Sequence, residues 1–272
     1  MEYEIRPAGK FKINFSELWD FRELIYFFTW RDIKVKYKQT VLGAAWVILQ
    51  PLLLVVIFSY TFSRLLSMET GTLQYPLFVF SGLLLWNIFS NGINSAGNSM
   101  ISNSNIINKI YFPRLIIPIS SIFSTLVDFA IQFGLFLVTL LIYGKYSSIG
   151  PFILVLPISL TITLLTTFGM GSFLAALNVK YRDFRYIVPF MTQVLLFLTP
   201  IIYPVSSINV PLLRMVFILN PVATAIELLR NGITGTPPHW DLVLLAFALS
   251  AAIFLVGITY FRKTEQYFAD LA

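Results

Sequence analysis

The sequence contains no cysteine and only one histidine, His239. Without cysteine, the chain has no disulfide bond, no thiolate nucleophile and no thiolate-bound metal. The histidine lies beside Trp240, where a position at a membrane interface explains it better than a metal site does. The Gly-x-x-x-x-Gly-Lys-Ser/Thr motif that cradles ATP phosphates is also missing. We therefore expect no catalytic centre, metal or cofactor in this chain.

Charged residues are scarce as well. They make up 12% of the 272 residues, against 57% hydrophobic residues and a mean hydropathy of +0.78. Soluble proteins contain about 25% charged residues, so the composition predicts an all-α integral membrane protein. Basic residues lie at the ends of apolar runs instead of on one soluble face, which argues against a nucleic-acid partner. A secretory signal is not expected, because many charged and aromatic residues precede the first long apolar run.

The apolar runs predict six membrane spans, each close to the length of about 20 residues that a bilayer requires. They cover residues 43–63, 76–98, 115–143, 151–177, 186–204 and 241–261. An even number of spans places both termini on one side of the membrane. The chain then reads as one transmembrane domain over residues 1–272, with an N-terminal segment 1–42, a bundle 43–261 and a tail 262–272.

The distribution of basic residues gives the orientation, since cytoplasmic segments are enriched in lysine and arginine. One set of segments holds Arg6, Lys10, Lys12, Arg22, Arg31, Lys34, Lys36, Lys38, Lys109, Arg114, Lys180, Arg182, Arg185, Arg262 and Lys263. The opposite set holds only Arg64, Lys145, Arg214 and Arg230. Both termini are therefore expected in the cytoplasm, with the protein in the inner (plasma) membrane of a bacterial-type cell.

Residues 15–30 predict an amphipathic helix before the first span. Leu18, Phe21, Ile25 and Phe28 recur at helical spacing. A helix of this kind lies on the membrane surface, and a basic run over residues 31–38 connects it to the first span. Two interpretations are open: simple anchoring to anionic lipid, or a gate against a transport path.

A long apolar stretch from 205 to 235 is interrupted by Pro211, Asn220-Pro221 and Gly232. Its two apolar pieces are too short to cross a bilayer. We expect two short re-entrant helices in the outer leaflet, with Glu227 and Arg230 adjacent on one of them.

Asp128 is the one acidic residue in the interior of a predicted span, and Gln132 follows it by one turn. Because an ionised residue in the membrane interior is costly, Asp128 should face protein or water. Structural hydrogen bonding, a place in a transport path and proton coupling are the three alternatives.

Aromatic residues make up 16% of the chain. Core packing and the interfacial belt account for most of them. Four of them are candidates for a path lined by aromatic faces on which sugar rings slide: Tyr37, Trp46, Tyr60 and Trp86.

Two polar segments interrupt the apolar runs on the predicted cytoplasmic side. The first, residues 99–114, carries Ile106, Ile107 and Ile110 at helical spacing before Pro113, which predicts a short helix with an apolar docking side. The second, residues 178–186, is a predicted loop with four ionised residues. The two segments are candidates to bind a soluble partner, although turns at the lipid surface are the alternative.

Several segments together resemble the permease subunits of type-2 ABC exporters, in particular the polysaccharide group that exports O-antigen, capsule and teichoic acid. The resemblance runs in order through most of the chain. Its segments are Trp30-Arg-Asp-Ile-Lys-Val-Lys-Tyr-Lys38, Leu42-Gly-Ala-Ala-Trp46 with Pro51, Tyr75-Pro-Leu77, Ser81-Gly-Leu-Leu-Leu-Trp86, Asn108-Lys-Ile-Tyr-Phe-Pro-Arg114, Asn178-Val-Lys-Tyr-Arg-Asp183, Leu198-Thr-Pro-Ile-Ile-Tyr-Pro204 and Asn220-Pro221.

This resemblance implies a pair of permeases working with two cytoplasmic ATPase subunits, which hold the ATP and Mg. It implies a long glycan as substrate, commonly on a lipid pyrophosphate carrier. By matching position, it implies that the following residues dock the ATPase: Ser104, Asn105, Ile106, Ile107, Asn108, Lys109, Tyr111, Arg114, Lys180, Tyr181, Arg182, Asp183 and Arg185. It places the cytoplasmic gate and a pyrophosphate contact at Trp30, Arg31, Lys34, Lys36 and Lys38, where lipid phosphates would be attracted equally.

Two other functions stay open at this point. Related permeases export small drugs or lipids, and a proton-coupled carrier would use Asp128. A membrane-embedded transferase is poorly supported, since the chain has no cluster of acids, histidines or cysteines.

Overall fold

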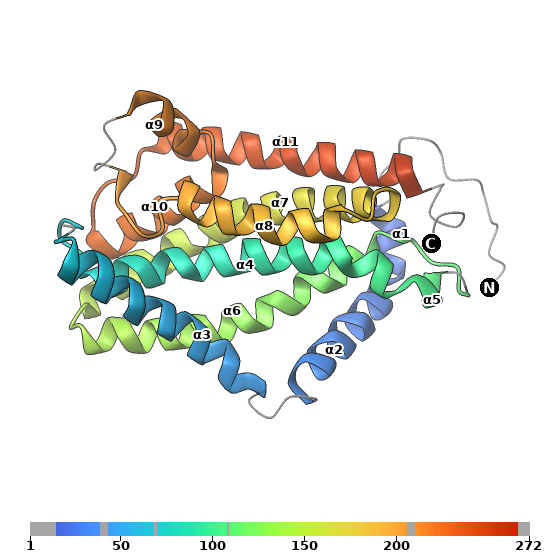
Figure 1. The fold of residues 1–272 in the computed structure, drawn as a ribbon, viewed down its shortest axis with the longest axis horizontal. Helices are drawn as coiled ribbons and strands as arrows, with labels where there is room; N and C mark the ends of the chain where they lie inside the picture. Colours follow the sequence, from blue (N-terminus) through green and yellow to red (C-terminus); the bar gives the residue numbers. More distant parts are fainter. Residues whose placement is uncertain (1–14, 39–42, 68–69, 108, 206–209, 266–272) are drawn as a thin grey trace.

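The computed structural model describes residues 15–38, 43–67, 70–107, 109–205 and 210–265. All regular secondary structure among these residues is helical, and they contain no strand (Figure 1). The elements are α1 (Phe15–Asp20), α2 (Arg22–Lys38), α3 (Gly43–Phe58), the π-helix η1 (Ser59–Leu65), α4 (Tyr75–Ser102), α5 (Ser104–Ile107), α6 (Ile116–Ile142), the 3₁₀ turn η2 (Tyr146–Ser148), α7 (Ile149–Lys180), α8 (Phe184–Leu198), α9 (Pro211–Ile218), α10 (Pro221–Thr234) and α11 (Trp240–Glu265).

Five helical segments are long and apolar enough to cross a membrane: Ala45–Leu65, Tyr75–Ser102, Ile116–Ile142, Tyr146–Lys180 and Trp240–Glu265. The protein is therefore a multi-pass membrane protein. These segments correspond to five of the six predicted spans. The sixth, predicted over 186–204, overlaps α8, which has only 15 residues, about 22 Å of helix. α8 ends early because Pro200 disfavours helical geometry at Thr199, whose ψ is 135°. A sixth span stays a prediction.

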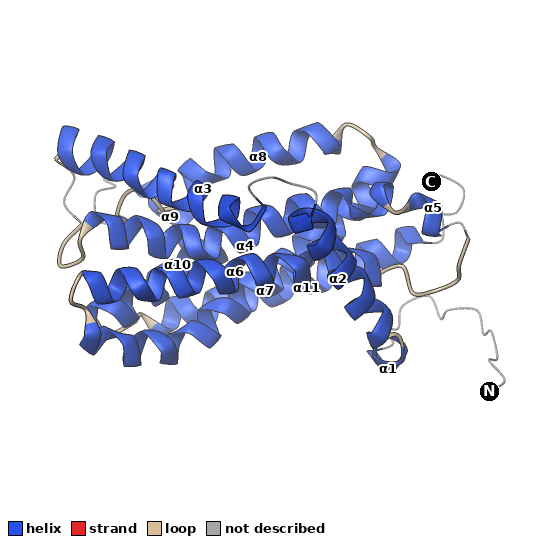
Figure 2. Ribbon diagram, turned by 90° about the horizontal axis from the view of Figure 1, so that it is seen from below, coloured by secondary structure: helices blue, strands red, loops and turns tan. Residues whose placement is uncertain are grey.

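α4 runs through the middle of the bundle, and most of its residues are buried. It packs against α6, α7, α8 and α10. Leu77, Leu83, Leu84 and Leu85 are fully buried in the main hydrophobic core. Figures 1 and 2 show α3 and α8 on one face of the bundle, with α4 behind them. α4 thus forms the centre of the core and also lies directly behind α3 and α8.

α7 and α11 approach each other more closely than side chains would allow. A Cβ built on Gly257 would lie 2.0 Å from the carbonyl oxygen of Gly169, and one on Gly169 would lie 2.5 Å from the carbonyl oxygen of Ile253. Small residues allow transmembrane helices to pack backbone against backbone. The two glycines therefore fix this crossing.

The N-terminal helices lie against the bundle instead of standing apart from it. Phe28 is buried in a second hydrophobic cluster, separate from the main core, and Leu18, Phe21 and Ile25 pack against this cluster. These contacts confirm the predicted apolar face. The Phe28 ring meets Phe112 with centroids 5.8 Å apart. α2 packs against α6 and continues as helix through the basic run to Lys38.

α9 and α10 are the two short helices that the sequence predicted after α8. Asn220 caps α10, since its Oδ1 accepts from the backbone N–H groups of Val222 and Ala223 at 3.0 and 3.4 Å. Gly235 ends the helix with a φ of 73° that favours glycine. Their depth in a membrane stays a prediction.

Candidate functional site

Asp128 is buried in α6 and binds two residues of α2. Lys36 Nζ donates to its Oδ2, and the Tyr37 hydroxyl donates to its Oδ1. Burial, together with the hydrogen bond to Asp128, raises the pKa of Tyr37 above its ordinary value. Of the three alternatives for Asp128, this geometry matches structural hydrogen bonding. The contact joins the N-terminal helix to the membrane bundle.

Gln132, one turn further along α6, extends this contact to two more helices. Its Oε1 accepts from Asn87 Nδ2 of α4 at 2.9 Å, and its Nε2 donates to the carbonyl oxygen of Val47 in α3 at 3.5 Å. Asp128 and Gln132 therefore hold α2, α3 and α4 on one side of α6.

A stripe of amides continues from Asn87 along α4. Asn91, Asn94 and Asn98 follow at spacings of four, three and four residues, which places them on one face. Asn94 Nδ2 donates to the carbonyl oxygen of Ser90 at 2.7 Å and to Thr192 Oγ1 of α8 at 3.4 Å. Asn178 of α7 donates to Asn98 Oδ1 at 3.2 Å and to the carbonyl oxygen of Gly97 at 2.9 Å. We call Asn87, Asn91, Asn94 and Asn98, with Asp128 and Gln132, the polar seam.

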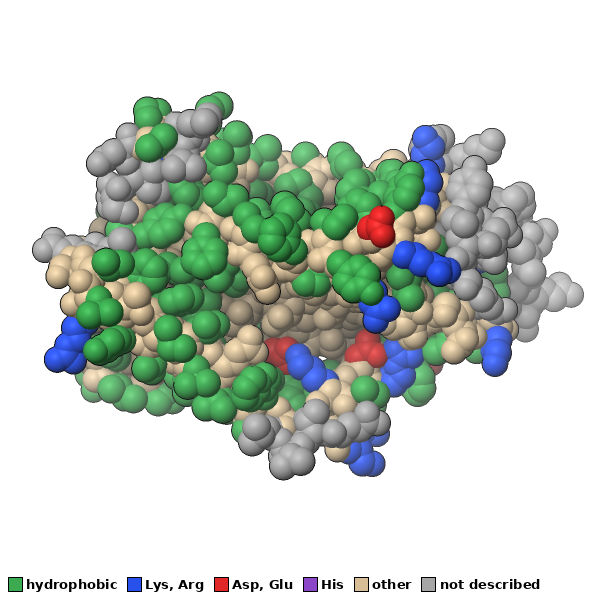
Figure 3. Space-filling view, in the orientation of Figure 1, with side chains coloured by type: hydrophobic (Ala, Val, Ile, Leu, Met, Phe, Trp, Pro, Cys, Tyr) green, Lys and Arg blue, Asp and Glu red, His purple; other side chains and the backbone are tan. Residues whose placement is uncertain are grey.

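Part of the polar seam has unused hydrogen-bonding capacity. Asn91 and its neighbour Ser95 are exposed. The buried Asn94 Oδ1 accepts no hydrogen bond within the described part of the chain. Figure 3 shows a hollow between α8 and the pair α2 and α3, with a floor of polar side chains and backbone, and with acidic and basic groups meeting along its lower edge. A polar hollow beside apolar helices can bind a hydroxylated solute, but it cannot face lipid.

The polar seam was missed by the sequence analysis, apart from Asp128 and Gln132. The signal was present, because four asparagines recur at helical spacing within one predicted span. Asparagine in a membrane span is costly unless it meets protein, water or a ligand.

The four candidate aromatic residues do not gather at one place. Tyr37 lies at the seam, whereas Trp86 is buried in the core, 5% exposed, with its ring 5.4 Å from Phe89. Trp46 is exposed on α3, and Tyr60 lies on η1 at the far end of that helix. These four residues therefore do not form one continuous row of aromatic rings within a single chain.

The basic residues of α2 differ in how their charge is satisfied. Arg31 pairs with Asp32 at 2.7 Å and stacks on Phe28, while Lys34 lies over the Trp30 ring at 5.3 Å. Lys38, in contrast, is exposed at the end of the helix. Any contact of this group with a phosphate stays a prediction.

The first predicted docking segment contains a helix of only four residues, α5. Ile107 is buried against the chain itself and Ile106 is half-buried, whereas Ile110 is 61% exposed, so only part of the expected apolar docking side is turned inward. Asn105, Lys109 and Tyr111 are exposed, whereas Ser104 is half-buried, and Asn108 lies outside the described residues. Arg114 is half-buried, and its backbone N–H and Nη1 donate to Glu265 at 3.0 and 2.6 Å.

The loop in the second predicted docking segment, residues 178–186, is shorter than predicted. α7 extends to Lys180 and α8 begins at Phe184, which leaves only Tyr181, Arg182 and Asp183 between them. A lysine in the last turn is favourable near the negative end of a helix, so the charge did not end the helix. Lys180, Tyr181, Arg182, Asp183 and Arg185 are all exposed. This segment and α5 lie at the same end of the bundle (Figure 1).

Arg230 of α10, which the sequence analysis placed beside Glu227, has a structural role that the sequence did not predict. Its guanidinium is buried and donates to the carbonyl oxygens of Pro200, Phe78 and Ile201 at 2.7, 3.0 and 3.0 Å. It also lies 3.8 Å from Glu227, as helical spacing predicted. A Cβ on Gly82 would come within 3.0 Å of its Nη2, so that glycine makes room for it. Arg230 thereby ties α10, α4 and the segment after α8 together.

Residues 23–234 match the family model described as ABC-2 type transporter. The chain belongs to this family. This ABC-2 transporter chain is 29% identical over 266 residues to an O-antigen export system permease protein RfbA of Klebsiella pneumoniae, covering 96% of this chain and 98% of the relative. It is 30% identical over 209 residues to an RfbA of Myxococcus xanthus, covering 76% and 79%. It is 27% identical over 247 residues to a polysialic acid transport protein KpsM of Escherichia coli, covering 87% and 91%.

Proposed function

We propose that this ABC-2 transporter chain is the transmembrane subunit of an ATP-driven exporter of polysaccharide, O-antigen-like and carried on a lipid, from the cytoplasm across the inner membrane. The observation that carries this proposal is the similarity, over nearly the whole chain, to permeases of O-antigen and polysialic acid export systems. The chain has no ATP-binding motif, so two copies of a separate cytoplasmic ATPase subunit supply the hydrolysis with Mg.

The polar seam supports a glycan in preference to an apolar drug. Asparagine side chains both donate and accept, as sugar hydroxyls do. Four of them in a row offer a succession of similar, weak contacts along which a uniform polymer advances. A small apolar drug would instead call for an enclosed apolar pocket.

The same seam supports a pair of permeases. The polar hollow on the α3–α8 face must be shielded from lipid. Apolar side chains are exposed on the two helices of this face, including Leu53 and Ile57 on α3 and Phe190 and Phe197 on α8. A second copy across this face would bury these side chains and enclose the hollow as a path between the two chains.

The proposal includes six spans with cytoplasmic termini, α8 being the fifth, and re-entrant α9 and α10 at the outer side. The described start of α1 and end of α11 lie at one end of the bundle (Figure 1), as an even number of spans requires. The exposed residues at 180–185 and 109–111 lie at that end and are the proposed ATPase contacts. The proposed gate and pyrophosphate contacts remain Trp30, Arg31, Lys34, Lys36 and Lys38.

Two measurements test this function. A tagged chain purified from its native membrane should carry an ABC ATPase with it. Deletion of its gene should trap finished glycan inside the cell. An active complex without an ATPase would disprove ATP-driven export, whereas normal surface glycan in a cell with no redundant exporter would favour a small drug or lipid as substrate.

A further inference from the structure

The end of α3 is a π-helix, in which each turn is wider than in an α-helix. Seven residues form η1, and the Leu66 backbone N–H donates to the carbonyl oxygen of Thr61, five residues earlier, at 3.2 Å. π-helical turns are rare and frequently mark functional sites. Ser59, Tyr60, Ser63 and Arg64 of η1 all line one pocket.

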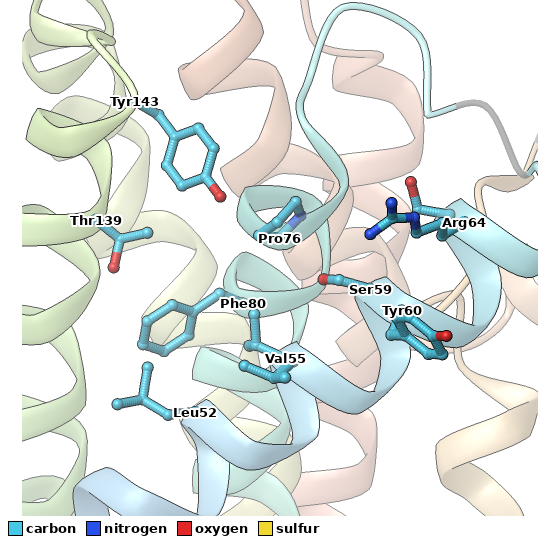
Figure 4. A pocket seen from close by; sticks show the side chains of 11 residues that line it. Leu52, Val55, Ser59, Tyr60, Arg64, Pro76, Phe80, Thr139 and Tyr143 are labelled. Carbon is cyan, nitrogen blue, oxygen red and sulfur yellow. The ribbon is translucent and has the colours of Figure 1, made fainter.

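This pocket has a volume of about 750 Å³ and lies between α3–η1, the start of α4 and the end of α6. Its inner part is apolar, formed by Leu52, Val55 and Phe80. Figure 4 shows the Arg64 guanidinium and the Tyr143 hydroxyl entering the upper part from opposite walls, with Pro76 between them. The pocket is therefore divided into a polar end and an apolar end.

The polar end carries a positive charge. Among the described residues that line the pocket, Arg64 is the one charged residue and none is acidic. The buried Ser59 hydroxyl has no hydrogen-bond partner among the described residues. Arginine together with neutral hydroxyls is a suitable donor set for a phosphate.

The direction of the pocket matches an amphiphile in a bilayer. The apolar end lies midway along α3, within a predicted span, and the polar end lies where α3–η1 and α6 finish, at the level of headgroups. Val56 and Tyr60 at its rim are 63% and 59% exposed, so the pocket opens at the surface of the chain. A soluble anion would make no use of the apolar end.

We propose that this pocket binds an anionic membrane lipid, with its phosphate between Arg64 and Tyr143 and an acyl chain along Val55, Val56 and Phe80. The bound lipid holds η1 against the ends of α4 and α6. This inference depends on the chain spanning a membrane, and it does not depend on which substrate is exported.

The test is lipid retention by the full-length chain, purified with its native assembly and reconstituted in nanodiscs. Native mass spectrometry would compare discs of phosphatidylglycerol with discs of zwitterionic phosphatidylcholine. We expect the wild type to retain phosphatidylglycerol preferentially, and Arg64→Gln to reduce this retention about fivefold. Arg214→Gln is the matched control, because Arg214 is an exposed arginine on α9 at the same end of the bundle and does not line the pocket. Equal retention by the two variants would overturn the proposal.

A second pair of variants tests the apolar end. Val56→Trp should fill the groove and displace the lipid, whereas Ile57→Trp, on an exposed neighbour outside the pocket, should not. Displacement of the lipid by inorganic phosphate alone would overturn the lipid assignment in favour of a simple phosphate site. Equal binding of phosphatidylcholine would overturn the requirement for anionic charge.

Discussion

Lys36 of α2 and Asp128 of α6 form an ion pair that joins the N-terminal helix to a membrane helix. The carboxylate is buried, while the lysine is half exposed. Tyr37 completes the site from the same helix. Lys36 and Tyr37 thus bind both oxygens of the Asp128 carboxylate.

The first prediction concerns this pair. Asp128→Asn and Lys36→Met should each weaken the attachment of α2, because each leaves a partner unsatisfied. The double variant should lose less than the sum of the two, with a coupling of about 1 kcal/mol. Thermal unfolding in detergent measures the stability, and export by energised cells measures the function. Additive losses would show that the pair does not couple. Abolished export in a fully stable Asp128→Asn protein would instead support proton coupling, for which Asp241→Asn on the exposed start of α11 is the control.

The second prediction concerns Arg230. Arg230→Met leaves the carbonyl groups of Phe78, Pro200 and Ile201 without their donor, and we expect a loss of about 3 kcal/mol in the free energy of unfolding. Arg230→Lys should recover only part of it, since an ammonium lacks the planar fork that reaches three acceptors. Titration with a denaturing detergent gives these values. Arg214→Met on exposed α9 should be neutral, and a similar loss there would argue against the specific role of Arg230.

The third prediction concerns the crossing of α7 and α11. Gly257→Val places side-chain atoms where the backbone of Gly169 lies, so the helices must separate and little folded protein should accumulate. Gly134→Ala is the matched control, because Gly134 is exposed on α6 with nothing within 4 Å of its added Cβ. Alanine there should be neutral or stabilising by up to about 1 kcal/mol. Size-exclusion chromatography of the fluorescently tagged chain separates the two outcomes.

The fourth prediction concerns the polar seam. Asn91→Leu removes an exposed amide without disturbing the core, so folding should be unchanged while glycan export falls. Thr161→Leu, at an exposed position of α7 outside the seam, should leave export unchanged. Surface glycan normalised to protein in the membrane is the measurement. Undiminished export in both variants would remove the seam from the transport path.

The fifth prediction concerns the short connection between α7 and α8. Arg182→Ala combined with Arg185→Ala should uncouple ATP hydrolysis from export, because both side chains are exposed and free to meet a partner. Insertion should be intact, and accessibility labelling at the chain ends checks this separately. A misoriented protein with normal coupling would show that these charges serve only to set the orientation.

The sequence predicted the spans well because each apolar run carries its own signal of length and hydropathy. It placed the start and end of α3–η1, α6 and α11 within a few residues. It placed the end of α7 too early, because Lys180 is charged and yet still part of the helix. It also failed at α8, where Pro200 ends the helix before the hydrophobic run ends.

The candidate site was harder to predict because its residues come together only in three dimensions. Asp128 and Gln132 stood out as polar residues in a span, but nothing in the sequence paired Asp128 with Lys36, 92 residues away. The docking role of Ile107 was expected from helical spacing and from the family resemblance, and neither tells whether a side chain faces outward or inward. The sequence placed Arg230 beside Glu227, but it did not predict the three carbonyl acceptors of its guanidinium.

The backbone contact between Gly169 and Gly257 has a mechanical consequence. α7 ends at Lys180, beside the exposed residues Arg182 and Asp183. Where two backbones touch, no side chains intervene that could change rotamer and absorb a displacement. A displacement of the Lys180 end of α7 is therefore transmitted to α11, so that the two helices move as one rigid unit. α3 and α8 lie on the opposite face of the bundle, where many of their side chains are exposed. With fewer packed side chains to hold them, we expect these two helices to be displaced more easily than α7 and α11.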